Sequence, residues 1–162
     1  MMALRNLAQF RKDGAEVTVV QPSPYHYYSG MGPGMLSGIY SPEEVRFNTR
    51  RLVEQQGVTF VQDEAVNIRG DINTVDLKTG KSLKYDILSC NTGSFVLEAI
   101  EREQDGDIFT VKPISNLLEV QKRLCQLASE GDVTVAVIGG GAAGTEIAAN
   151  VSSLLKRSSS YH

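Results

Sequence analysis

The stretch VTVAVIGGGAAGTEIAAN, residues Val133–Asn150, decides the fold of this chain. It opens on an apolar run, Val133–Ile138, which is typical of a central strand in a parallel sheet. Three glycines in G-x-G-x-x-G spacing follow, and a helical pattern then continues with Ile147 and Val151 on one side. A strand, a glycine turn and a helix in this order predict the start of a dinucleotide-binding βαβ unit.

The glycine spacing has a physical purpose in such a unit. The first glycine makes the tight turn, the second lets a pyrophosphate approach the backbone, and the third lets the helix pack closely on the strand. The alternative is a glycine turn with a purely structural role. The supporting acidic residue is expected about 20 positions further on, beyond the last residue, His162. The predicted site consists of Gly139, Gly140, Gly141, Ala142, Ala143 and Gly144.

Composition and charge narrow the classes of function. A chain of 162 residues, 41% hydrophobic and 22% charged, is globular in composition and fits one domain, or one domain plus part of another. The formal net charge of -3 argues against nucleic-acid binding and against general binding to a membrane surface, because both need a basic patch. No run of about 18 apolar residues is present, so the sequence predicts no membrane-spanning helix.

The two cysteines, Cys90 and Cys125, have neither the spacing of a redox pair nor that of metal ligands. Cys90 follows an apolar strand pattern and Cys125 lies in a helical pattern, so we expect both thiols to be buried and inert. No metal site is predicted. A reducing cytoplasm fits this use of cysteine.

The N-terminal residues predict a helix that leads directly into a buried strand. Four residues with helical spacing share one face, and Gly14 suits the C-terminal cap; the four are Ala3, Leu4, Leu7 and Ala8. The strand is Glu16–Val20. This is the second half of a βαβ unit, and we expect its first strand and glycine turn to precede Met1 in a longer parent protein.

A long segment rich in Gly, Pro, Ser and Tyr, residues 21–44, separates this strand from the next helix. Because loops of such length in compact domains are more often functional than plain connectors, we expect it to line a site. Ser41, Pro42 and Glu44 match an N-cap, a first helical residue and a capping box. They predict a helix that ends near Gln56, before Gly57.

The rest of the chain predicts strands, then a helix. Val58–Val61 is a short buried strand, and apolar and polar residues then alternate with turn signals at Gly70-Asp71 and Thr79-Gly80. This pattern predicts a small antiparallel meander, whose last strand, Asp86–Cys90, returns to the main sheet. Residues 112–131 predict a helix of about four turns. The predicted fold class is α/β: a Rossmann-like parallel sheet with flanking helices and a small antiparallel β-meander, incomplete at both ends.

The order of these parts resembles the two-dinucleotide-binding flavoproteins of the pyridine nucleotide-disulfide oxidoreductase superfamily. The segments that carry the resemblance cover nearly the whole chain in the family's order: AEVTVVQPSPYHYYSGMGPGMLSG, GVTFVQDEAVNI, KYDILSCNTGS, VKPISN and VAVIGGGAAGTEIAAN. It is closest to type II, quinone-reducing NADH dehydrogenase-like flavoproteins. The segments YYSGMGPGMLSG and YDILSCNTGS are also similar to relatives associated with selenophosphate synthetase.

The resemblance implies an FAD site. In the family an acidic residue at the end of the second strand usually binds the adenosine ribose, and the residue here is the uncharged Gln21. Ala65-Val66 would place backbone beside the adenine. The triplet Thr92, Gly93 and Ser94 would approach the flavin's diphosphate side, and Tyr28–Pro33 would lie near the flavin ring or the electron acceptor.

The resemblance also implies an NAD(P)H site at the glycine turn, with Glu146 as the family's motif glutamate near the nicotinamide. An alternative role for Glu146 is to stabilise the first turn of its helix by its charge. Residues 1–108 would be a partial FAD-binding domain, and residues 109–162 a linker helix with the first βα unit of the NAD(P)H-binding domain. No catalytic residue is assigned, because the flavin itself carries hydride transfer.

The expected function is that of an FAD-dependent NAD(P)H oxidoreductase, which passes a hydride to flavin and electrons to a quinone or similar small-molecule acceptor. The family's disulfide-reducing branch has a flavin-adjacent cysteine pair that this sequence lacks, so thiol-disulfide chemistry is not expected. Two alternatives stay open. One is a flavoprotein of selenium or sulfide metabolism, and the other is a folded fragment of a larger enzyme with no activity of its own.

The expected location is the cytoplasm, with the parent protein peripheral to the inner membrane as an open alternative. A further hypothesis concerns the sheet edge at Glu16–Val20. Val133–Ile138 would fill the vacant place beside it, within one chain or by exchange between two chains in a domain-swapped homodimer.

Overall fold

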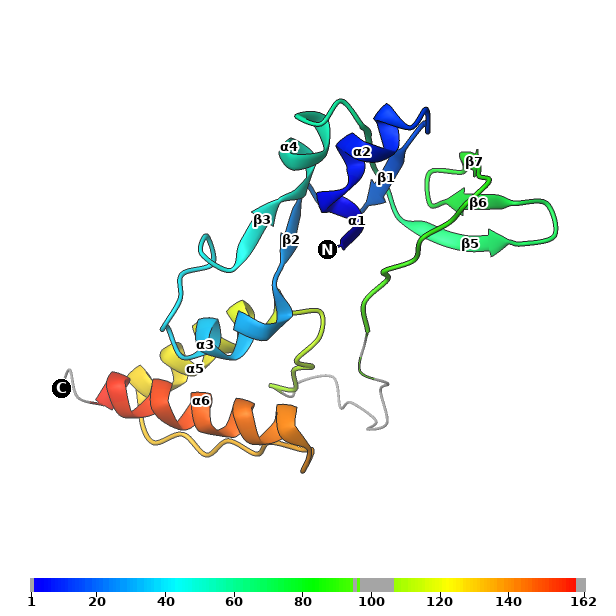
Figure 1. The fold of residues 1–162 in the computed structure, drawn as a ribbon. Coiled ribbons are helices and arrows are strands. Elements are labelled where there is room, and N and C mark those ends of the chain that lie inside the picture. Colours follow the sequence, from blue (N-terminus) through cyan, green and yellow to red (C-terminus); the bar gives the residue numbers. More distant parts are fainter. Residues whose placement is uncertain (1, 95, 97–106, 160–162) are drawn as a thin grey trace. The chain divides into compact units, whose positions relative to one another are not determined.

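The computed structural model describes residues 2–94, 96 and 107–159, which form a mixed α/β fold (Figure 1). Its helices are α1 (Met2–Arg5), α2 (Leu7–Lys12), α3 (Gly32–Leu36), α4 (Thr49–Glu54), α5 (Asn116–Glu130) and α6 (Ala142–Ser159), with a 3-10 turn η1 (Ser29–Met31). Its strands are β1 (Thr18–Gln21), β2 (Tyr25–Tyr27), β3 (Arg46–Asn48), β4 (Thr59–Gln62), β5 (Ala65–Arg69), β6 (Thr74–Leu77) and β7 (Ser82–Lys84). The chain divides into two compact units, residues 1–26 with 47–92 and residues 27–46 with 93–162.

The first unit is built on a parallel pair of strands. β1 pairs with β4 in a register that places Val19 opposite Phe60 and Gln21 opposite Gln62. A small core covers this pair, with Leu7, Val53 and Val58 buried and four partly buried residues around them: Leu4, Val17, Val19 and Phe60. The predicted strands near Glu16–Val20 and Val58–Val61 are confirmed, and so is the parallel sheet of the predicted fold class.

The N-terminal helix is interrupted at Asn6 but ends as predicted. Gly14 has a φ of 88°, its N–H donates to the Arg11 carbonyl, and the Ala15 N–H donates to the Phe10 carbonyl at 3.0 Å. Glycine adopts this left-handed conformation without the strain that a Cβ would bring, so it serves as the helix cap.

The predicted meander is present as the antiparallel sheet β5-β6-β7. Its predicted final strand, Asp86–Cys90, is wrong. The segment forms no strand, and Ile87 is 92% exposed. A strand exists through its ladder of hydrogen bonds to a neighbour, and within the described part of the chain no strand pairs with this segment.

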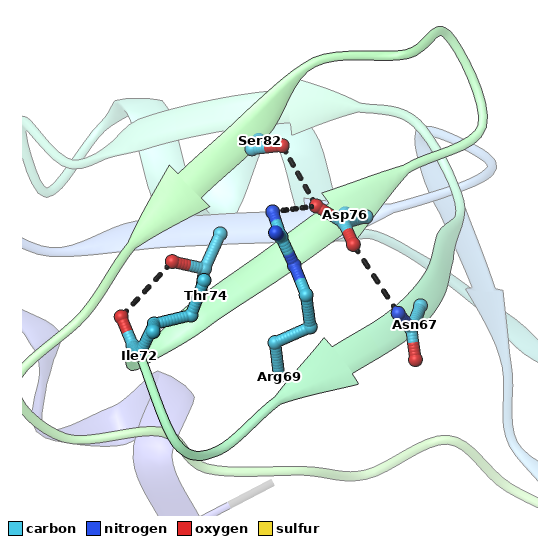
Figure 2. A network of polar contacts seen from close by, with 6 residues as sticks. All are labelled: Asn67, Arg69, Ile72, Thr74, Asp76 and Ser82. Carbon is cyan, nitrogen blue, oxygen red and sulfur yellow. Dashed lines mark hydrogen bonds and ion pairs between the residues drawn. The ribbon is translucent and has the colours of Figure 1, made fainter.

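A polar network crosses the three strands of the meander (Figure 2). Asp76 of β6 accepts hydrogen bonds from Arg69 at 2.8 Å, from Ser82 at 2.7 Å and from the Asn67 side-chain amide at 3.3 Å. The bonds from Ser82 and Arg69 hold the pKa of the Asp76 carboxyl below its usual range. Because its donors come from β5 and β7, this one carboxylate ties both outer strands to the central one.

The helix predicted from Ser41 to about Gln56 is correct only in its second half. Ser41 and Glu44 do form the reciprocal capping bonds, with the Ser41 N–H donating to the Glu44 carboxylate at 2.7 Å. The backbone then passes through a turn into β3, which pairs with β2. The helix α4 starts later, at a second cap, where the Asn48 side chain accepts from the Arg51 N–H at 2.9 Å.

The second unit has a helical core. Contacts join α3, α5 and α6, and eight buried residues form the cluster: Met35, Leu36, Val45, Leu117, Leu124, Ile147, Val151 and Leu154. The Gln121 side chain of α5 donates to the Met35 carbonyl at 2.8 Å and to the Leu36 carbonyl at 3.1 Å. The Leu36 carbonyl at the end of α3 thereby gains a side-chain donor, and the Met35 carbonyl accepts from the Gly38 N–H as well.

The predicted central strand Val133–Ile138 is not formed. The segment has no secondary structure, Val133 and Val137 pack against the helical core, and Ile138 is 79% exposed. β1 pairs with β4, and the described residues provide no partner strand for Val133–Ile138. The hypothesis that this segment fills the sheet edge beside β1, within one chain or by exchange between two chains, stays a prediction.

The expected burial of the two cysteines is also wrong, since both thiols are free and exposed. Cys90 lies in the segment that forms no strand, so no strand of the described residues pairs beside it and covers it. Cys125 follows Leu124, the residue that faces the core, and one step along a helix turns a side chain about 100° away from its neighbour.

No helix in the described ranges combines the length and the apolarity that a membrane crossing requires.

Candidate cofactor-binding site

The glycine turn before α6 has the close packing that its spacing predicts. Gly139 has a φ of 132°, a backbone conformation that favours glycine. A Cβ at position 144 would overlap the carbonyl oxygen of Gly139, so position 144 requires glycine. The contact joins the first and third glycines of the motif, and the chain folds back on itself directly at the start of the helix.

The middle of the turn is open. A Cβ added at Gly140 or Gly141 would meet no atom within 4 Å, and residues 139–143 are all exposed. Unpaired N–H groups at the start of an 18-residue helix, α6, carry a partial positive charge, which attracts phosphate. The turn therefore fits a pyrophosphate that approaches the backbone from solvent.

Glu146 is exposed on α6, and its backbone carbonyl accepts from the Asn150 side chain at 2.9 Å. The helix begins at Ala142, and its first turn holds no acidic residue. The alternative role for Glu146 was to stabilise the first turn of α6 by its charge. That role is wrong, because Glu146 lies outside the first turn. Its predicted place near a nicotinamide stays a prediction.

Gln21 ends β1, where ligands of parallel sheets usually bind. Its amide nitrogen donates to the carbonyls of Ser23 and Tyr25, the latter at 3.0 Å. A glutamine amide has two N–H donors, so both are used by the loop that follows the strand. What this side chain can offer a ribose is its carbonyl oxygen, an acceptor that serves a hydroxyl donor as the usual carboxylate would.

Ala65 and Val66 open β5 at an irregularity in the ladder. The pairing with β6 shifts register between Ala65 and Asn67, so Val66 lies at the bulge, and its side chain is 56% exposed. A bulge leaves backbone groups unpaired and re-aims the neighbouring side chains. This feature suits backbone contact with a ligand such as adenine.

The triplet Thr92, Gly93 and Ser94 is exposed and has no regular secondary structure. Gly93 has a φ of 74°, with open space where a Cβ would stand. Lys112 lies beside this triplet, and its ammonium donates a hydrogen bond to the Ser94 hydroxyl. Lys112 was not among the residues predicted from the sequence, although it lies in VKPISN, one of the segments that carry the family resemblance.

In the loop that was predicted to line a site, two tyrosine rings pack against the backbone of glycine residues. A Cβ at Gly34 would lie 2.7 Å from the ring of Tyr40, and one at Gly30 would lie 3.1 Å from the ring of Tyr28. Tyr40 is 38% exposed and Tyr28 is 46% exposed. Glycine at both positions therefore allows each ring to lie directly on the chain.

The predicted site residues are distributed over both compact units. Gln21, Ala65, Val66 and Thr92 belong to the first unit, and Gly93, Ser94 and residues 139–146 belong to the second. Within the second unit, the structure brings the glycines of the motif together in one turn and joins Ser94 to Lys112.

Comparison with known proteins gives a family match across almost the whole chain. The family model of the pyridine nucleotide-disulphide oxidoreductases matches residues 1–159. The sulfide-quinone reductase of Aquifex aeolicus (strain VF5) is 28% identical over 138 residues, which are 85% of this chain and 31% of that protein. A mitochondrial sulfide:quinone oxidoreductase of Dictyostelium discoideum is 29% identical over 82 residues. The chain spans about a third of the length of the Aquifex relative.

Solved structures show the same fold. The sulfide:quinone oxidoreductase of Aquifex aeolicus superposes with a TM-score of 0.65 at 24% identity, covering 79% of this chain and 30% of that one. NDH2 from Plasmodium falciparum, in complex with NADH, gives 0.66 at 20% identity over 90% of this chain and 34% of that one. NADH:rubredoxin oxidoreductase from Clostridium acetobutylicum gives 0.61 at 20% identity over 91% and 40%. The chain belongs to the pyridine nucleotide-disulphide oxidoreductase family.

Proposed function

We propose that this chain is part of an FAD-dependent NAD(P)H oxidoreductase, in which a hydride passes from NAD(P)H to flavin and electrons pass on to a quinone or similar acceptor. The observation that carries the proposal is the glycine turn: Gly144 packs on Gly139, and the middle of the turn is open at the start of α6. A turn that must be glycine at 144 yet stays open at 140 and 141 serves a diphosphate better than it serves packing alone.

The same proposal assigns the parts of the site. Residues 139–144 bind the pyrophosphate of NAD(P)H, with Glu146 near the nicotinamide. Gln21, Ala65-Val66 and Thr92–Ser94 hold the ribose, adenine and diphosphate of FAD. FAD, when bound, supplies the hydride and electron chemistry, and the protein residues bind and orient the two nucleotides. Residues 1–108 then belong to the FAD-binding part and residues 109–162 to the linker and NAD(P)H-binding part.

A second candidate is oxidation of sulfide with transfer of electrons to a quinone. The similarity to two sulfide:quinone oxidoreductases favours it, since the Aquifex protein matches 85% of the chain. A third candidate is a folded piece of such an enzyme without turnover of its own. For location, we propose the cytoplasm, with the whole enzyme peripheral to the inner membrane, where a lipid-soluble quinone is available.

The experiment that tests the proposal starts with the absorbance spectrum of the purified chain and its titration with FAD. Bound flavin, or saturable uptake with a shifted flavin band, supports an FAD site. Turnover is then measured with NADH, NADPH or sulfide as donor and a water-soluble quinone as acceptor. Oxidation of NAD(P)H supports the first candidate and oxidation of sulfide the second. Uptake of FAD without turnover supports the third, and a colourless chain that ignores FAD contradicts the proposed site.

We also propose that two chains associate by exchange of Val133–Ile138. The apolar segment forms no strand, and Ile138 is 79% exposed, while β1 and β4 form a parallel pair of two strands. Pairing between chains would give the segment the ladder it lacks. Light scattering after size exclusion tests this: a dimer that Ile138→Asp converts to monomer supports exchange, and a monomer at all concentrations contradicts it.

A further inference from the structure

The carboxyl-terminal ends of β1 and β4 carry two glutamines side by side. Gln21 and Gln62 are register partners in the parallel pair, so their side chains point to the same face of the sheet. Phe60 lies two residues before Gln62 and shares this face, because successive residues of a strand alternate between the two faces. Parallel sheets bind their ligands at this edge.

Arg50 of α4 brings a positive charge to the same face. Its Nη2 donates to the side-chain carbonyl of Gln62 at 2.8 Å, and its guanidinium lies over the Phe60 ring, 5.1 Å from the ring centroid. The stacking and the hydrogen bond together hold the planar guanidinium in one orientation. The backbone N–H of Arg50 also donates to the Pro24 carbonyl at 3.2 Å, which ties the start of α4 to the loop after β1.

The guanidinium of Arg50 keeps N–H donors for a ligand. Within the part of the chain that the structure describes, its Nη1 makes no hydrogen bond and its Nη2 makes one. Because each of these nitrogens carries two hydrogens, three terminal donors are left. The carboxylate of Glu54 lies 3.9 Å from the Arg50 Nε, and the two side chains are 56% and 42% exposed, so this ion pair is weak.

Position 21 lacks the negative charge that is usual at this place in the family. A carboxylate there accepts from the hydroxyls of an adenosine ribose and repels a phosphate attached to that ribose. Gln21 is neutral, and its amide N–H groups donate to the carbonyls of Ser23 and Tyr25. Beside the place of the ribose, this edge therefore has the charge of Arg50 and no opposing charge at residue 21.

We propose that Arg50 forms a phosphate subsite at this edge, so that the first unit binds adenosine nucleotides whose ribose carries a phosphate. The inference rests on the proposed function, which puts the adenosine ribose of FAD at Gln21. A guanidinium is suited to the subsite because its planar fork matches the oxygens of a phosphate. Nucleotides with a phosphorylated ribose, NADP(H) among them, then compete with FAD for the first unit.

The test compares the affinity of the full chain for AMP with its affinity for adenosine 2′,5′-bisphosphate, which adds only the ribose phosphate. The 3′,5′ isomer is titrated as well, and the isomer that binds more tightly identifies the position of the phosphate. NMR titration of the nitrogen-15-labelled chain, followed at the backbone amides of β1 and β4, measures these weak affinities. The variants are Arg50→Met, Arg50→Lys, Gln21→Glu and Arg51→Met. Arg51 is an exposed arginine of the same helix and serves as the matched control.

We expect wild type to bind the bisphosphate at least about fivefold more tightly than AMP, because a charge-assisted hydrogen bond is gained. This ratio should fall to about one in Arg50→Met and stay within about twofold of wild type in Arg51→Met. Arg50→Lys should keep part of it, since lysine keeps the charge and loses the fork. Gln21→Glu should lower it below about one by repulsion. Circular dichroism establishes that each variant folds, and Arg50→Gln replaces Arg50→Met if the latter does not fold.

Three other results would overturn the inference. If wild type binds FAD but binds AMP and both bisphosphates equally, Arg50 forms no phosphate subsite, while the proposed FAD site stands. If Arg51→Met lowers the ratio as much as Arg50→Met does, the preference comes from the overall charge of α4 and not from a subsite. If neither FAD nor AMP shifts the amides of β1, this inference fails together with the proposed function.

Discussion

The strands β1 and β4 of the first unit and the segment Val133–Ile138 of the second have similar apolar sequences and different structures. VVQ and TFVQ lie in paired strands, whereas VTVAVI forms none and leaves Ile138 79% exposed. The helix that follows this segment, α6, forms nevertheless, because a helix completes its hydrogen bonds within itself. A run of apolar residues indicates where a strand can form. The strand forms only where a neighbouring strand pairs with it through backbone hydrogen bonds.

Two isoleucines of the second unit should differ most in their contribution to stability. Ile147 is 7% exposed in the helical core and Ile138 is 79% exposed before the glycine turn. We expect Ile147→Ala to lower the free energy of unfolding by about 2–5 kcal/mol, the usual cost of a truncated core side chain. Ile138→Ala should change it by less than about 0.5 kcal/mol. Urea denaturation followed by circular dichroism measures both, and equal losses would mean that Val133–Ile138 is a buried strand.

The glycine turn gives the next largest effect. Gly144→Ala forces a Cβ into the Gly139 carbonyl oxygen, so we expect a loss of about 2–3 kcal/mol and displacement of the start of α6. The matched control is Gly140→Ala, where the added Cβ meets open space and the change should stay within about 0.5 kcal/mol. Identical unfolding curves for the two variants would show that the turn is not closed in solution.

A smaller effect separates the two caps at the predicted helix Ser41–Gln56. Asn48→Ala removes the side chain that accepts from the Arg51 N–H, and we expect a loss of about 1 kcal/mol. Ser41→Ala removes a bond to a turn that no helix continues, so its cost should be the lower of the two. If thermal unfolding shows a larger loss of stability for Ser41→Ala than for Asn48→Ala, the helix starts at Ser41 and not at Asn48.

The smallest effect belongs to Asp76 in the meander. Its folded pKa is lowered by bonds from Ser82 and Arg69, so its stabilising contribution is present above the unfolded pKa of about 3.9 and is lost as the pH falls through the folded value. NMR titration of the carboxyl carbon should give a midpoint below that of an unfolded peptide. Asp76→Asn should lessen the loss of stability between neutral and acidic pH, and an unchanged acid transition would argue against the network of Figure 2.

The sequence correctly predicted the features that depend on residues close together in the chain. Gly14 ends its helix as expected, the meander turns at Thr79-Gly80, and the glycine motif packs first glycine on third, because each depends on residues close in the chain. Which segments pair with partners far away in the chain could not be predicted from the sequence. Nothing in VTVAVI or DILSC says whether a neighbouring strand is available, and the exposure of Cys90 follows from the same uncertainty.

The residues of the candidate site also differ in how far local sequence predicts them. The glycine turn could be placed from its spacing alone, whereas Gln21, Ala65-Val66 and Thr92–Ser94 came from family resemblance. The contact between Lys112 and Ser94 joins residues 18 positions apart through a loop, and no periodic pattern announces such a contact. The reduced role of Gln21 as an acceptor likewise depends on where Ser23 and Tyr25 turn their carbonyls.

The most direct test of the central claim, that residues 139–144 are a dinucleotide-binding turn, is an NMR titration of the nitrogen-15-labelled chain with NADH. We expect saturable shifts of the backbone amides of Gly140, Gly141 and the first turn of α6, and the loss of these shifts in Gly144→Val. An unchanged spectrum at millimolar NADH, or shifts confined to other parts of the chain, would contradict it.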